Sequence, residues 1–359
     1  MTTPPRTQAL TAPAAPPSGV EALSPPAQSS RGRSAGPPVT EAPTASVQEA
    51  RNRTATPPRD ATRSPRTPTP GTPTTPRFAY GTNGFGDHRL PDALRVLADL
   101  GYEGVSLTLD HQHLDPYADH LPRRIADVRR VLDVTGLALV VETGARYLLD
   151  PWRKHRPTLL SAEADGRALR LDLLRRAIGI GAELGAEAVH FWSGAADPGT
   201  RPEDAWARLV DGCAETVAHA DAAGIDLAFE PEPGMLVADL AGYRRLDDAL
   251  GRPDRFRLTL DIGHCRCLEP HSVTRCVELA ADRLAHVQIE DMRRGVHEHL
   301  PFGEGDIHFP PVLAALGAAG YRGLVSVELP RHSHAATATA RHSIEFLRSA
   351  ALLKEVVPV

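Results

Sequence analysis

The chain has 359 residues, of which 42% are hydrophobic and 24% charged, and its formal net charge is −5. That is enough apolar material for one large domain or two ordinary ones. No stretch approaches the roughly 18 apolar residues of a membrane-spanning helix, and four cysteines in so long a chain do not make a disulfide scaffold. The sequence contains only two lysines and no G-x-x-x-x-G-K motif, which excludes a P-loop. We therefore expect a cytoplasmic protein with reduced cysteines and no membrane association.

Residues 1–76 differ sharply from the rest of the chain. They hold 17 of the 33 prolines and 14 threonines, but no aromatic residue, His, Lys or Cys. Their eight arginines and four acidic residues give a net charge of +4, which leaves −9 for residues 77–359. So little apolar surface cannot offset roughly 1–2 kcal/mol of backbone entropy per residue. We predict a disordered N-terminal extension over residues 1–76 and a folded domain over 77–355. The alternatives for the extension are a Pro-rich ligand, a processing or transit peptide, and an Arg-bearing arm that binds nucleic acid.

From Arg77 onward, short apolar runs alternate with amphipathic helical patterns, and five of the helical patterns end in Gly before the next run. Eight strand–helix units over about 280 residues match a (β/α)8 TIM barrel, which typically takes ~250. A doubly wound sheet would need a Gly-rich turn after the first strand, and Gly81–Gly84 is a poor match. We therefore predict an α/β fold of the TIM-barrel type. The predicted strands are Phe78–Gly81, Val105–Leu109, Leu137–Glu142, Ala188–Trp192, Ile225–Glu230, Phe256–Asp261, Ala285–Ile289 and Leu324–Glu328. The clearest predicted helices are Asp92–Leu100, Arg123–Leu132, Leu169–Leu184, Ala205–Ala223 and Ser343–Leu353.

Carboxylates and imidazoles accumulate where these strands end, which is where a barrel of this type places its active site. Buried carboxylates without partners would repel one another and take up protons. A divalent cation with oxygen and nitrogen ligands removes that conflict, so the pattern predicts a metal site. The alternative for any single acid is that it caps the next helix or pairs with an arginine. The residues at or near the strand ends are Asp110, His111, His113, Glu142, Glu230, Asp261, His264, His286 and Glu328.

Five pieces of the sequence, in order, resemble the xylose isomerase-like barrel superfamily. They read LAFEPEPG, LTLDIGHC, AHVQIED, FGEGDIHF and GLVSVELP. That superfamily includes sugar isomerases, ketose 3-epimerases, inosose dehydratases and the apurinic endonuclease IV enzymes. The resemblance implies one divalent ion (Mn, Co, Mg or Zn) held by Glu230, Asp261, His286 and Glu328.

The same resemblance implies catalytic roles for Glu230 and Glu328, as acid and base on opposite faces of the substrate. Moving a proton from a carbon next to a carbonyl requires a Lewis acid on the oxygens and carboxylates that remove and return the proton. His264 would orient a substrate oxygen or bind a second metal.

A second resemblance concerns Gly295–His299, which is similar to the segment where endonuclease IV places an Asp-x-His pair. In this sequence His297 stands at the position of the Asp. The resemblance leaves a two- or three-metal site open, and the alternative is that these are solvated loop histidines. The candidate ligands for a second or third metal are Glu142, His111, His113, His264, His297 and His299.

The charge of the folded part argues for a small polyhydroxy substrate and against nucleic acid, since a duplex-binding surface needs basic residues to neutralise phosphates. We expect Arg153 and Arg293 to contact the substrate, and Trp192 to form a wall for a sugar ring. The alternatives are a solvated surface loop for Arg153 and core packing for Trp192. The sequence also leaves open whether the chain forms a homo-oligomer.

Together these features predict a divalent-metal-dependent isomerase or epimerase that acts on a sugar, sugar phosphate or cyclitol through an enediolate. The alternatives are a multi-metal zinc phosphodiesterase or hydrolase resembling endonuclease IV, and a cyclitol dehydratase. A barrel that binds a ligand without catalysis would bind no metal.

Overall fold

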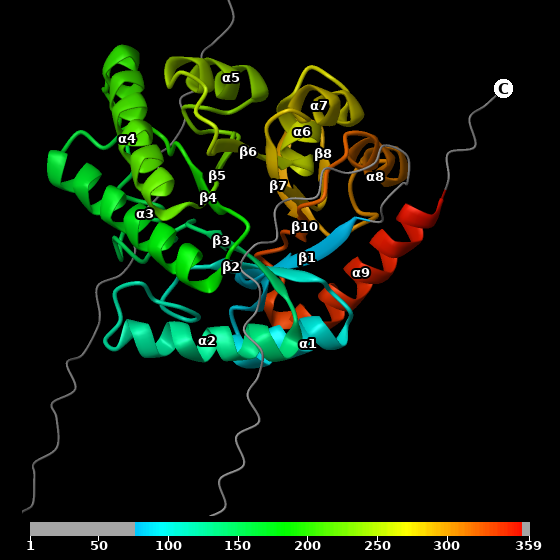
Figure 1. Ribbon diagram of the computed structural model, residues 1–359. Helices are drawn as coiled ribbons and strands as arrows, with labels where there is room; N and C mark the ends of the chain where they lie inside the picture. Colours follow the sequence, from blue (N-terminus) through cyan, green and yellow to red (C-terminus); the bar gives the residue numbers. More distant parts are fainter. Residues whose placement is uncertain (1–75, 354–359) are drawn as a thin grey trace, which may run out of the picture. The chain divides into compact units, whose positions relative to one another are not determined.

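The computed structural model describes residues 76–353, in which eight parallel strands close into a barrel (Figure 1). The strands follow one another around the barrel in the order β1, β10, β7, β6, β5, β4, β3, β2. Closure comes from the parallel pairing of the first strand with the last, in which Arg77 lies opposite Leu324. The barrel strands are β1 (Arg77–Gly81), β2 (Gly104–Thr108), β3 (Ala138–Glu142), β4 (Val189–Trp192), β5 (Leu227–Glu230), β6 (Phe256–Asp261), β7 (Leu284–Ile289) and β10 (Leu324–Val327).

The predicted fold is confirmed, and each predicted strand overlaps the observed one with ends that differ by two residues at most. The extension predicted over residues 1–76 lies, except for Pro76, outside the described residues. Among those described, no helix combines the length and the apolar character needed to cross a membrane.

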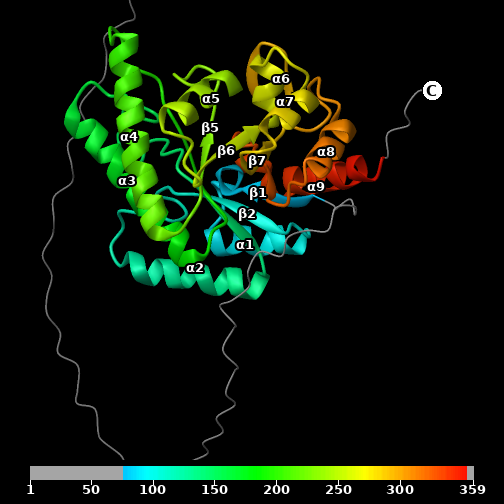
Figure 2. The same ribbon diagram turned by 45° about the horizontal axis from the view of Figure 1, so that its top comes forward.

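Helices surround the strands on the outside of the barrel (Figure 2). Several begin with proline in the first turn, where the missing N–H has no helical partner to lose. Gly136 and Gly224 end two of them with left-handed φ angles of 72° and 70°, as the sequence predicted from glycine before each strand. The helical elements are η1 (Thr82–Phe85), α1 (Leu90–Asp99), α2 (Leu121–Thr135), α3 (Ala164–Leu184), α4 (Pro202–Ala223), α5 (Leu240–Ala249), α6 (Ile262–Leu268), α7 (Val273–Ala280), α8 (Phe309–Ala318), η2 (Ser333–Ala335) and α9 (Ala336–Leu352).

One element departs from the regular alternation. After β7, an antiparallel hairpin made of β8 (Asp291–Arg293) and β9 (Val296–Leu300) stands outside the barrel order. The sequence reasoning did not predict this hairpin. It matters for the site because β9 carries His297 and His299.

The core has two different layers. Between strands and helices, aromatic rings pack at centroid distances of 5.2–5.8 Å, among them Phe191, Phe229, Phe256 and Tyr243. Each large apolar side chain buried in this way contributes about 1.5–3 kcal/mol to stability. Inside the barrel, by contrast, polar side chains are buried. The inner layer therefore contains the polar side chains that could react or bind a ligand, and the apolar outer layer fixes the strands that carry them.

Candidate active site

Carboxylates converge at the carboxyl ends of the barrel strands. Glu142, Glu230 and Asp261 end β3, β5 and β6, and each is at most 4% exposed. Glu328 follows β10 directly. Three of these residues, Glu142, Glu230 and Glu328, line a cavity of about 240 Å³. The carboxylates predicted at strand ends therefore lie at one end of the barrel, and three of them share a cavity.

Three overlapping groups of side chains place their ligand atoms within 4.8 Å of one another. In the part of the chain that the structure describes, these groups bring together most of the predicted ligands and add Glu232 and Glu290. The groups are Asp261, Glu290, His299 and Glu328; Glu230, Glu232 and His264; and His264, His297 and His299.

Glu232 and Glu290 are the candidate ligands that the sequence reasoning missed, and the more deeply buried of the two is Glu290. It follows β7, is 0% exposed, and neither of its carboxylate oxygens has a hydrogen-bond partner. Its Oε1 lies 3.7 Å from Nδ1 of His299. The signal was present in the sequence AHVQIED. Side chains of a strand alternate, so His286, Gln288 and Glu290 share one face, and the last of them is nearest the mouth.

The structure does not bring His286 to the predicted metal group. Its ring is fully buried, with Nε2 3.4 Å from Oγ of Ser106. At about 3.3 Å per residue, His286 precedes Glu290 by roughly 13 Å along the strand, too far for both to hold one ion. Gln288, between them, donates hydrogen bonds of 2.9 Å to Glu328 and 3.3 Å to Glu142.

Asp261 and His264 are fixed by the junction of β6 and α6. Oδ1 of Asp261 accepts a 2.6 Å hydrogen bond from the backbone N–H of His264, which caps the helix. Oδ2 of the same carboxylate has no hydrogen-bond partner. Burial lowers the pKa of His264 to about 3, so its imidazole is neutral and suited to bind a cation.

The hairpin delivers two more imidazoles to this junction. Nε2 of His297 lies 3.0 Å from Nε2 of His264 and 3.7 Å from Oε1 of Glu232. Burial opposes a positive charge on His299, but Glu290 and Glu328 outweigh burial and raise the pKa of His299 well above its usual value. The two histidines of the hairpin thus lie beside the other candidate ligands, although His297 itself is exposed.

The two predicted catalytic glutamates are held differently. Oε2 of Glu230 lies 2.8 Å from Nε2 of His190, while its Oε1 has no hydrogen-bond partner. Glu328 accepts a hydrogen bond of 3.0 Å from Asn83 at Oε1 and one of 2.9 Å from Gln288 at Oε2. Burial and the neighbouring carboxylates raise the pKa of Glu230 well above its usual value, and burial likewise raises that of Glu328.

The other predicted ligands do not assemble. Glu142 accepts a 2.9 Å hydrogen bond from Thr108 and lines the cavity, but belongs to none of the three groups. His113 is buried with Nε2 3.3 Å from the backbone oxygen of Phe85. His111 is exposed and lines a neighbouring cavity. These three residues therefore supply no further metal site in the described structure.

Of the predicted substrate contacts, only Trp192 lines the cavity. Its ring is buried under the guanidinium of Arg170, which lies 4.2 Å from the ring centroid. Arg153 points to solvent and pairs with Asp150 at 2.6 Å. Arg293 is exposed and donates to the backbone oxygen of Glu304. Neither arginine lines the cavity, because each is engaged by its own loop.

The residues present fit a divalent cation. Buried polar atoms that lack a hydrogen-bond partner are costly and require a partner. Cations with oxygen and nitrogen ligands, bound at these three groups, would give such atoms partners and would relieve the repulsion among the carboxylates. The atoms concerned are Oε1 of Glu230, Oδ2 of Asp261, both oxygens of Glu290, Nδ1 of His264 and Nδ1 of His299.

Fold and site together define a class of protein, a TIM barrel with a mouth of buried carboxylates and imidazoles. Residues 94–350 match the model of the xylose isomerase-like TIM barrel family, and the chain belongs to that family.

Relatives of known name are similar over two thirds of the chain. The L-ribulose-5-phosphate 3-epimerase UlaE of Salmonella paratyphi C (strain RKS4594) is 26% identical over 239 residues, which is 66% of this chain and 81% of that protein. The protein of the same name from Shigella flexneri serotype 5b (strain 8401) matches to the same extent.

Solved structures are similar in fold. The 3-keto-D-glucoside 4-epimerase YcjR from E. coli superposes with a TM-score of 0.63 at 18% identity, over 76% of this chain and 99% of the other. A D-allulose 3-epimerase from Methylomonas sp. gives a TM-score of 0.61 at 20% identity, over 77% and 99%. At such identities the likeness shows the fold alone.

Proposed function

We propose that the chain is a divalent-metal-dependent epimerase or isomerase that acts on a sugar, sugar phosphate or cyclitol. The observation that carries the proposal is the convergence of Asp261, Glu290, His299 and Glu328 within 4.8 Å. The names of its relatives, which are sugar epimerases, support the same class of reaction.

These four residues are the proposed ligands, with Glu290 and His299 in the roles first expected of Glu230 and His286. When bound, a divalent ion would supply Lewis-acid chemistry, stabilising negative charge on the substrate oxygens as an enediolate forms. The neutral His264, whose Nδ1 lies 3.4 Å from Oε1 of Glu230, orients a substrate oxygen or helps to hold a second cation.

Glu328 is the proposed base in one direction of the reaction. Both of its oxygens accept amide N–H groups, from Asn83 and Gln288, and such donors favour the ionised carboxylate. It removes the proton from the substrate carbon next to the carbonyl. In the reverse direction it returns that proton.

Glu230 is the proposed acid. In the barrel order, β6 and β7 separate β5 from β10, so Glu230 approaches the substrate from a different side than Glu328. His190 holds Oε2 of Glu230, which leaves Oε1 to carry the proton. Delivery of that proton to the opposite face of the substrate carbon inverts the configuration there.

The test is proton exchange with solvent. Metal-reconstituted protein is incubated in D2O with a panel of ketoses, ketose phosphates and inososes, and NMR follows deuterium at the carbon next to the carbonyl. Glu328→Gln should abolish the exchange while the protein stays folded, and Glu345→Gln, an exposed change on α9, should not affect it. A metal-loaded protein that exchanges no proton on any of these compounds would overturn the proposal. Loss of water from an inosose would indicate a dehydratase instead.

One observation favours a second candidate, a multi-metal phosphodiesterase or hydrolase. His264, His297 and His299 form a ligand group beside the carboxylates, and two cations close together suit phosphate ester hydrolysis. Two or three tightly held zinc ions, together with hydrolysis of bis(p-nitrophenyl) phosphate, would favour this candidate. One weaker Mn, Co or Mg ion would favour the epimerase.

A further inference from the structure

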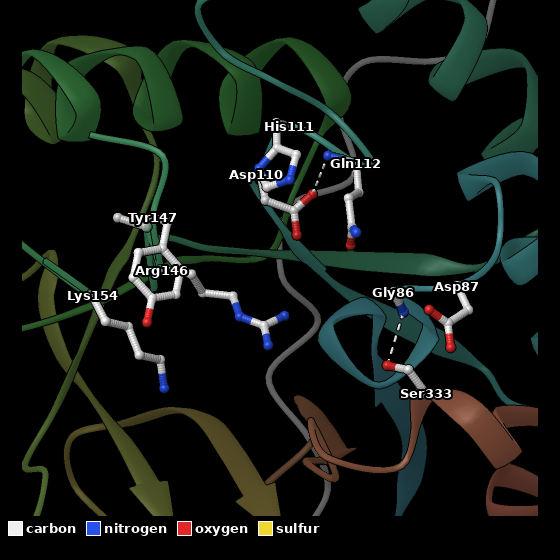
Figure 3. Close-up of a pocket in the computed structure, with 10 residues that line it drawn as sticks. Gly86, Asp87, Asp110, His111, Gln112, Arg146, Tyr147, Lys154 and Ser333 are labelled. Atoms are coloured by element: carbon white, nitrogen blue, oxygen red, sulfur yellow. Dashed lines mark hydrogen bonds between the residues drawn. The ribbon is translucent and has the colours of Figure 1, made fainter. Parts of the chain in front are cut away.

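A second cavity of about 250 Å³ lies beside the first, and the two share Arg146 and Lys154 as lining residues. Figure 3 shows both side chains extending into this space, with the Arg146 guanidinium at its centre. The other lining residues come from the loops after β1, β2, β3 and β10. They are Gly86, Asp87, Asp110, His111, Gln112, Ala145, Tyr147 and Ser333.

The boundary that the two cavities share carries two cations that form no direct ion pair. Among residues 76–353, neither Arg146 nor Lys154 forms an ion pair with any acidic side chain. Burial, then the nearby Arg146 and Arg331, lower the pKa of the Lys154 ammonium, while the carboxylates of Glu232 and Glu328 act in the opposite direction. Arg331 lines the first cavity as well. Lys154 is also one of only two lysines in the whole chain.

The acids of the second cavity do not cancel this charge. Oδ1 of Asp110 accepts hydrogen bonds from the backbone N–H groups of Gln112 and His113, so one oxygen of this carboxylate is engaged by its own turn. Asp87 is exposed and lies in Figure 3 beside Gly86, across the cavity from Lys154. The first cavity shares these cations on its wall but is also lined by four glutamates, which the second cavity lacks.

The loop that carries the two cations is held in a specific conformation. Ala145, Arg146 and His155 adopt left-handed φ angles of 59°, 33° and 64°, each of which costs of order 1–3 kcal/mol unless the surroundings enforce it. The enforcing contacts are a hydrogen bond from the His155 N–H to the Arg146 carbonyl and an edge contact of the His155 ring on Trp192 at 5.4 Å. Through His155, the loop that carries the cations is thus attached to Trp192, which lines the first cavity.

We propose that Arg146 and Lys154, assisted by Arg331, form an anion subsite that takes the phosphate of a phosphorylated sugar while the reacting carbons occupy the carboxylate-lined cavity. Two cations that form no direct ion pair suit a doubly charged phosphate monoester better than a singly charged carboxylate. This inference rests on the proposed function and narrows its substrate class. The glutamates of the first cavity repel the phosphate, whereas Arg146 and Lys154 attract it. Together these charges fix the direction in which the substrate lies.

The test measures binding without turnover. Inorganic phosphate is titrated into the metal-loaded full chain by calorimetry, alongside the variants Arg146→Gln and Lys154→Met. Both residues lie in a surface loop, and circular dichroism checks that the variants fold. Each variant should weaken phosphate binding about tenfold or more, as expected for loss of a charged hydrogen bond. Arg124→Gln, an exposed change on α2, is the matched control and should bind as the parent does.

Substrate kinetics separates this proposal from the proposed function. For a ketose phosphate, the double variant should raise KM about tenfold or more with kcat little changed, whereas an unphosphorylated ketose should keep its KM. Unchanged phosphate affinity in both variants overturns the subsite. If the variants weaken phosphate binding but the protein exchanges no proton on any ketose, the anion subsite is supported and the epimerase function is rejected. If the double variant raises the KM of a carboxylated sugar more than that of the phosphorylated one, the choice of phosphate is overturned.

Discussion

Glu290→Gln should change stability in opposite directions with and without a divalent cation. The side chain is 0% exposed, and both of its oxygens lack a hydrogen-bond partner. In chelator-treated protein at pH 7, the group is costly whether it stays ionised or takes up a proton, and glutamine has the same shape without the charge. The glutamine amide is also unpaired there, but it avoids the cost of burying a charge or of taking up a proton at pH 7, so the variant should gain about 1–3 kcal/mol.

With the cation present the sign reverses. Losing a charged ligand should weaken cation binding by about 100-fold, which is about 2.7 kcal/mol. Because bound ligand stabilises the folded state by mass action, the variant should lose most of the stabilisation that the cation gives the parent. In thermal unfolding, each kcal/mol corresponds to about 2–4 °C for a domain of this size.

The assay is urea and thermal unfolding of parent and variant, each with chelator and with excess Mn²⁺, plus calorimetric titration of Mn²⁺. Glu345→Gln, an exposed acid on α9, is the control for loss of one negative charge and should shift neither series. A variant that is less stable than the parent in chelator, yet binds Mn²⁺ with the parent's affinity, would refute the assignment of Glu290 as a ligand.

Three further predictions follow from buried groups. Burial and the Glu328 carboxylate raise the pKa of Glu142 from 4.5 to about 7, so between these pH values the folded state binds more protons than the unfolded state. The free energy of unfolding in chelator should therefore fall as pH rises, by up to about 1.4 kcal/mol per pH unit for this group, and urea unfolding of Glu142→Gln should show a flatter profile. His286→Asn should leave the Mn²⁺ dissociation constant within about threefold of the parent in calorimetry, since the ring lies deep in the barrel beside Ser106; a 100-fold loss would restore it as a ligand. Tyr102→Phe removes a buried 2.7 Å hydrogen bond to a backbone carbonyl and should cost about 1 kcal/mol in urea unfolding; an unchanged midpoint would mean that the bond contributes nothing.

The barrel and its active end were predictable because both depend on local pattern. Apolar runs bounded by polar residues and by glycine located all eight strands, and strand ends located Glu230, Asp261 and Glu328. These features need only the period of a strand and the geometry of a parallel barrel.

The remaining errors concern how far along a strand a side chain lies and which way a loop side chain points. His286 and Glu290 lie on the same face of the same segment, and only the length of β7 decides which of them reaches the mouth. The orientation of Arg153 and Arg293 depends on hydrogen bonds within their own loops, to Asp150 and to the Glu304 carbonyl. Such loop contacts have no periodic signature in the sequence.

The central claim is that a cation is held at the barrel mouth by acids of β6 and of the segments after β7 and β10, together with a histidine of the hairpin. An anomalous-difference map from crystals soaked in Mn²⁺ tests it most directly. We expect a peak within ligand distance of Asp261, Glu290, His299 and Glu328. A map without a peak there, or with its peak beside His286, would contradict it.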